Sequence, residues 1–142
     1  HVPPTGLWDA SRARFGGYVE AGRVDPRATY RVLVTTNHED GMVQILEAGG
    51  TLSHEFFDES VQRSWWGSAP AYRCFLDRRG VDRVLLDPEY ARVLDWSDEP
   101  RLLAQLVELR FASVGFRGAD GTIEYHLSGA APEGCPAPRT AR

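Results

Sequence analysis

The sequence predicts a small three-layer α/β domain whose mainly parallel sheet is extended by a C-terminal antiparallel hairpin. Two strand-like runs of aliphatic residues, 30–36 and 81–87, are separated by helical patterns, as in parallel strands joined by crossover helices. Two further runs, 112–117 and 122–127, flank a turn at 118–121 and indicate the hairpin. The 142-residue chain is long enough for one core that buries roughly 70% of the surface exposed by the unfolded chain.

The first predicted helix spans 7–21 and carries aromatic residues at near-helical spacing. Gly16 and Gly17 interrupt it, at a cost of about 2 kcal/mol relative to alanine. Asp25-Pro26 then marks a turn before the strand at 30–36.

Asp40 is the predicted N-cap of the second helix, which spans 41–48 and has a short apolar stripe. Gly49 or Gly50 supplies the left-handed residue that ends it. The two residues that follow, 51–52, are predicted to form a short strand.

Two helices are predicted before the second long strand. The first spans 55–66, and the second spans 71–79, opened by Pro70 and stopped by Gly80.

The clearest helical pattern in the chain covers 100–111, preceded by Asp98 and Glu99, which the positive end of the helix dipole favours. Its apolar stripe consists of Leu102, Leu103, Leu106, Val107 and Phe111. Outside these elements we predict a linker at 1–7, a single domain over 8–129 and a flexible tail at 130–142.

Charge argues against one class of partner. The net charge is −4, whereas a nucleic-acid-binding protein needs a basic face for phosphates.

No run approaches the ~20 apolar residues of a membrane-spanning helix. The start at His1-Val2-Pro3-Pro4, without methionine, is typical of a piece cut from a longer chain. We expect the preceding part to contain the membrane segments.

The turn after the first strand argues against nucleotides. Asn37-His38-Glu39-Asp40-Gly41 has one glycine and two carboxylates, whereas phosphate-binding turns are glycine-rich because backbone amides must approach the phosphate closely. We therefore expect neither ATP nor NAD to bind, and we expect no cofactor.

A weak metal pattern occurs in His54-Glu55-Phe56-Phe57-Asp58, which resembles H-E-x-x-H with aspartate in place of the second histidine. On a helix His54 and Asp58 would share a face, and His38, Glu39 or Asp40 would have to supply a third ligand. A small metal-dependent enzyme is thus one hypothesis. A solvated helix start explains the same residues and is the preferred interpretation, because acidic residues are common there.

The cysteines and adjacent tryptophans leave alternatives open. Cys74 lies within a predicted helix, where a packed thiol is usual, and it would pair with Cys135 in an oxidising compartment. Sequence spacing cannot decide this, since a disulfide needs Cα atoms within about 7 Å. Trp65 and Trp66 cannot both face the core from one helix. Either one indole is exposed, for stacking on a sugar or docking at a membrane interface, or both pack under the following loop, which is the preferred interpretation.

Several segments together resemble a known group of proteins. These are Tyr30-Arg31-Val32-Leu33-Val34, His38-Glu39-Asp40-Gly41, Glu47-Ala48-Gly49-Gly50, Phe75-Leu76, Arg79-Gly80-Val81-Asp82-Arg83-Val84-Leu85-Leu86 and Ile123-Glu124-Tyr125-His126-Leu127. Over roughly 8–128 the chain is similar to the carboxy-terminal domains of polytopic membrane glycosyltransferase-like proteins of the C-type superfamily. Those proteins transfer sugars from polyprenyl-phosphate carriers.

The resemblance implies a non-catalytic domain on the extracytoplasmic side of the membrane, which helps to position an acceptor glycan or a partner. The membrane-embedded remainder of the parent protein is then its covalent partner. Extracytoplasmic placement in turn predicts a Cys74–Cys135 disulfide. No catalytic residue can be carried over, because the catalytic carboxylate of that superfamily usually lies in the membrane part.

A glycan site is predicted at the carboxyl ends of the parallel strands, where open α/β sheets bind ligands. There Glu39, Asp40 and Asp87 are predicted to accept hydrogen bonds from sugar hydroxyls. His38 or Tyr90 is predicted to present a ring face, with Trp66 as a neighbour.

Overall fold

The sheet of the computed structural model, which describes residues 15–34, 40–53, 65, 67–94 and 96–135, has five strands in the order β2-β1-β3-β5-β4. The strands are β1 (Thr29–Leu33), β2 (Thr51–Leu52), β3 (Arg83–Leu86), β4 (Ala112–Arg117) and β5 (Ile123–Leu127). The first three are parallel to one another, whereas β5 is antiparallel to both β3 and β4. This confirms the predicted α/β class, the mixed sheet and the C-terminal hairpin.

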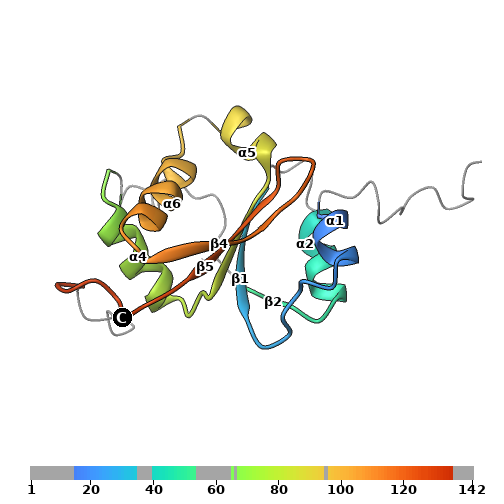
Figure 1. The fold of residues 1–142 in the computed structure, drawn as a ribbon, viewed down its shortest axis with the longest axis horizontal. Coiled ribbons are helices and arrows are strands. Elements are labelled where there is room, and N and C mark those ends of the chain that lie inside the picture. The colour runs from blue at the N-terminus through green and yellow to red at the C-terminus, as the bar shows by residue number, and fades with distance from the viewer. Residues whose placement is uncertain (1–14, 35–39, 54–64, 66, 95, 136–142) are drawn as a thin grey trace, which may run out of the picture.

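Helices cover both faces of the sheet (Figure 1). They are α1 (Gly16–Glu20), α2 (Asp40–Glu47), α4 (Ala69–Arg78), α5 (Pro88–Val93) and α6 (Glu99–Glu108). In Figure 1, α4 and α6 lie on one side of the strands and α1 and α2 on the other, which makes three layers. In the described residues, no helix has the length and apolar character needed to cross a membrane.

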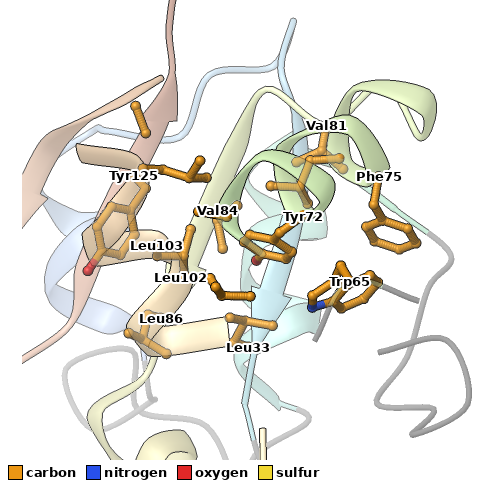
Figure 2. Close-up of a cluster of buried hydrophobic side chains, with 14 of the residues drawn as sticks. Leu33, Trp65, Tyr72, Phe75, Val81, Val84, Leu86, Leu102, Leu103 and Tyr125 are labelled. Atoms are coloured by element: carbon orange, nitrogen blue, oxygen red, sulfur yellow. The ribbon is translucent and has the colours of Figure 1, made fainter. Parts of the chain in front are cut away.

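The larger hydrophobic core lies between the sheet and the α4–α6 layer (Figure 2). Leu33, Val84 and Tyr125 reach it from three neighbouring strands, because alternate strand residues point to the same face. Residues one position away, such as Val32 and Leu85, belong to a smaller core with α1 and α2. Strand alternation therefore divides the interior into two cores.

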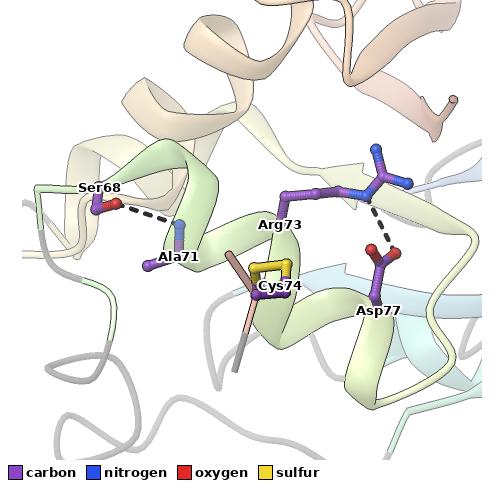
Figure 3. The surroundings of a disulfide bond; sticks show 6 residues. Ser68, Ala71, Arg73, Cys74 and Asp77 are labelled. Carbon is purple, nitrogen blue, oxygen red and sulfur yellow. Dashed lines mark hydrogen bonds and ion pairs between the residues drawn. A yellow bond between two sulfur atoms is a disulfide. The ribbon is translucent and has the colours of Figure 1, made fainter. Parts of the chain in front are cut away.

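Local signals explain the boundaries of α4. The hydroxyl of Ser68 accepts a hydrogen bond from the backbone N–H of Ala71 at 3.2 Å (Figure 3), which satisfies one free amide of the first turn. At the other end Gly80 has a φ of +70°, a conformation that glycine adopts without a steric penalty. The predicted stop at Gly80 is confirmed.

Some predicted boundaries are wrong. The helix α5 was not predicted, because its six residues are too few to show a helical periodicity and it is held by one buried side chain, Tyr90. Helix α2 begins at Asp40 itself, one residue before the predicted start. The predicted linker at 1–7 and most of the predicted helix at 55–66 lie outside the described residues.

Candidate functional site

The predicted glycan site included two residues that follow β3, Asp87 and Tyr90. Both side chains have 0% exposure, so neither can contact a sugar at the surface. The hydroxyl of Tyr90 donates to Glu99 Oε2 at 3.0 Å and lies 3.1 Å from Ser97 Oγ. The ring of Tyr90 is part of the hydrophobic core, whereas the predicted sugar contact would place it at the surface.

Most of the other predicted site residues lie outside the described residues: His38, Glu39, Trp66 and the metal candidates His54 and Asp58. Asp40 is described only as the first residue of α2. Among the described residues there is no group of three or more His, Cys, Asp or Glu side chains that could hold a metal ion.

Trp65 is the described member of the tryptophan pair, and it is buried. Its ring centroid lies 5.3 Å from that of Tyr72 and 4.1 Å from that of Phe75. This indole belongs to the core shown in Figure 2.

A buried ion pair occupies the α4–α6 side of the sheet. Arg31 on β1 donates to Glu99 through Nε at 2.7 Å and through Nη2 at 2.8 Å. Tyr72 donates to the same carboxylate at 2.8 Å, in addition to the bond from Tyr90. Because Glu99 has 0% exposure and its two oxygens accept four hydrogen bonds, it is a structural carboxylate.

The charges of this pair reinforce each other. Burial alone lowers the pKa of Arg31, but the adjacent Glu99 carboxylate outweighs burial and raises that pKa above its usual range. Burial, followed by the charge of Glu99, raises the pKa of Tyr72 well above its usual value. Arg31 therefore keeps its charge and Tyr72 remains a hydrogen-bond donor at neutral pH.

A second polar cluster lies on the opposite face of the sheet, where α1 packs. Tyr18 of α1 donates a hydrogen bond to Glu124 of β5, and its oxygen lies 2.9 Å from the hydroxyl oxygen of Tyr30. The Tyr30 hydroxyl in turn accepts from the backbone N–H of Asp25 at 2.8 Å. Burial and the bond to Glu124 raise the pKa of Tyr18 far above its usual range, so its proton stays on the phenol.

The outer half of this cluster reaches the surface. His126 Nε2 lies 2.5 Å from Glu124 Oε1 and 2.6 Å from Arg83 Nη1. Arg83 also donates to Asp25 Oδ2 at 3.1 Å. Arg83 and His126 are directly opposite each other in the β3–β5 ladder, so strand register brings the guanidinium to the imidazole.

A pocket with a volume of about 320 Å³, which we call the polar pocket, lies at the surface beside this cluster. It is lined by Asp25, Arg27, Ala28, Asp82, Arg83, His126 and Leu127. These residues come from the segment before β1, the start of β3 and the end of β5. The polar pocket is therefore at the amino ends of the parallel strands, opposite the predicted edge.

Sequence reasoning missed this pocket, although one signal was present. Glu124 and His126 are two residues apart in a strand, so they point to the same face. Two charged or polar groups on one face of a strand that has a neighbour on each side suggest a polar cluster. Their partners Asp25 and Arg83 come from other segments and depend on strand order.

Gly115 makes room for the cluster. It lies where the β4–β5 register shifts between Val114 and Phe116, as in a β-bulge. A Cβ atom at this position would lie 2.2 Å from His126 Nε2 and 2.5 Å from Glu124 Oε1. The close approach of these two side chains to the backbone of β4 therefore requires glycine.

We expect Gly115→Ala to lower the free energy of unfolding by about 1–3 kcal/mol, because the added methyl group overpacks the cluster. Urea denaturation measures this. Gly17→Ala is the matched control, since no atom lies within 4 Å of its added Cβ and the residue is within α1. The control should be stabilising by up to about 1 kcal/mol. A Gly115→Ala protein as stable as the parent would show that the His126–Glu124 pair can move aside.

Comparisons of the chain with known protein families, curated proteins and solved structures find no match.

Proposed function

We propose that this chain is an extracytoplasmic accessory domain of a membrane glycosyltransferase-like protein, which holds an acceptor glycan and does not itself transfer sugar. The observation that carries the proposal is the disulfide between Cys74 and Cys135, whose Cα atoms are 5.5 Å apart. Disulfides form and persist in oxidising compartments and are rare in the cytosol. The bond thus supports placement outside the cytoplasm.

The surroundings of the disulfide support a structural role for it (Figure 3). Cys74 is a buried residue of α4, and Cys135 follows the end of β5. The neighbouring Arg73 also ties the same parts of the chain together. Its guanidinium donates to the carbonyls of Phe111, Ser128 and Gly129 at 2.6, 2.8 and 3.0 Å. A covalent bond and two hydrogen bonds therefore attach the segment after β5 to α4, and a third hydrogen bond holds the residue before β4.

The accessory role has separate support from the two polar clusters. The buried acid Glu99 accepts four hydrogen bonds, whereas the polar pocket presents charged side chains at the surface. Binding at a surface pocket needs no reacting group. A domain of this kind holds a ligand for chemistry that takes place elsewhere in the parent protein.

Thiol labelling of the full parent protein in intact cells tests the location. We expect no reaction of Cys74 or Cys135 with a membrane-impermeant maleimide until an impermeant reductant is added, after which both should be labelled. Labelling that requires cell lysis would overturn the extracytoplasmic placement. In a parallel assay, the 142-residue chain should not consume a polyprenyl-linked sugar, and turnover would overturn the accessory role.

A further inference from the structure

We infer that the polar pocket binds adjacent hydroxyl groups of a neutral sugar, an inference that rests on the proposed function and gives it a site. The pocket holds carboxylates and guanidinium groups side by side: Asp25 and Asp82 are the acids, and Arg27 and Arg83 are the bases. His126 completes the polar lining. This mixture of charges decides which ligands fit.

An anion such as phosphate could contact the guanidinium groups, but it would also face the carboxylates of Asp25 and Asp82, which carry the same sign of charge. A cation would face Arg27 and Arg83 in the same way. A hydroxyl group both donates and accepts hydrogen bonds, so a neutral diol can donate to a carboxylate and accept from a guanidinium at once. A neutral carbohydrate therefore satisfies the lining without an unpaired charge.

The two carboxylates are held in place before any ligand arrives. Asp25 Oδ1 accepts from the backbone N–H of Arg27 at 2.9 Å, and Asp25 Oδ2 accepts from Arg83 at 3.1 Å. Asp82 Oδ2 accepts from the backbone N–H of Thr29 at 2.9 Å. Fixed acceptors lower the side-chain entropy that the protein must lose on binding, and each carboxylate oxygen has a second lone pair for a hydroxyl.

Arg27 is the available donor. Its side chain is 93% exposed, and its nearest carboxylate contact is 3.9 Å, to Asp25. Within the described part of the chain its guanidinium makes no hydrogen bond, whereas Arg83 is engaged by Asp25 and His126. Arg27 can therefore close over a bound sugar without breaking a bond that stabilises the fold.

Amide NMR titration tests this inference. The probes are the methyl glycosides of glucose, galactose and mannose, with inorganic phosphate as the anion. We expect at least one glycoside to shift the amide signals of Ala28, Asp82, Arg83 and His126, and we expect phosphate to shift none of them. Shifts with phosphate alone, or glycoside shifts confined to the opposite edge of the sheet, would overturn the site.

Two variants strengthen the test. Arg27→Ala should weaken the affinity roughly tenfold, because a hydrogen bond to a charged group is lost. Arg92→Ala is the matched control: it removes a 73% exposed arginine from α5 and should leave the affinity unchanged. If the Arg27→Ala variant and the unsubstituted domain bound the glycoside with equal affinity, the role of Arg27 would be overturned.

Failure here is separable from failure of the proposed function. Glycoside shifts at another surface would reject the polar pocket and keep the accessory role, which the labelling and turnover assays judge without reference to the pocket. If the labelling found Cys74 and Cys135 in the cytoplasm while a glycoside still shifted the amide signals of the polar pocket, the proposed location would be rejected and the sugar site would be kept.

Discussion

Replacing Glu99 by glutamine is expected to lower the free energy of unfolding by about 3–5 kcal/mol, since breaking a buried ion pair leaves an uncompensated charge. The side chain of Arg31 is 2% exposed, so water cannot solvate its guanidinium once the carboxylate is gone. The amide of glutamine also turns a donor toward the donors of Arg31. Urea denaturation of the oxidised protein measures the loss.

Glu108→Gln is the matched control, because Glu108 is an exposed residue at the other end of the same helix. Its effect should stay within about 0.5 kcal/mol. The double variant Arg31→Met/Glu99→Leu should recover part of the loss, since hydrophobic replacements remove both charges together. If Glu99→Gln were as stable as Glu108→Gln, the ion pair would not be needed for stability.

Loss of the disulfide is expected to lower the free energy of unfolding by about 4 kcal/mol. Cys74 and Cys135 are separated by 61 residues, and a bond that closes a loop of this length strongly restricts the unfolded chain. The variant Cys74→Ala/Cys135→Ser tests this with a small residue at the buried position. Urea denaturation with and without reductant supplies the comparison.

Reductant should lower the free energy of unfolding of the unsubstituted domain by as much as the double substitution does. It should not change the free energy of unfolding of the double variant. Because Arg73 still holds the segment after β5 to α4 through the carbonyls of Ser128 and Gly129, the reduced domain should keep its sheet, as measured by far-ultraviolet circular dichroism. If reductant did not change the unfolding of the unsubstituted domain, the prediction would be contradicted.

The order of most elements is determined by local patterns in the sequence. The aliphatic runs that became β1 and β3, the turn between β4 and β5, and the signals around α4 and α6 each act over a few residues. Such patterns reflect strand and helix periodicity and turn chemistry, which depend only on near neighbours along the chain. The α/β class and the mixed sheet could therefore be predicted.

The polar sites were decided only by the tertiary structure. Arg31 and Glu99 are 68 residues apart, and Asp25 meets Arg83 across 58 residues. Each pairing depends on strand order and register, which no local pattern encodes. Burial follows the same rule. Asp87 and Tyr90 occupy the strand end where a ligand was expected, but both are buried in the folded domain, and Tyr90 is part of the core. Local sequence determined the elements, and long-range packing decided which polar side chains reach the surface.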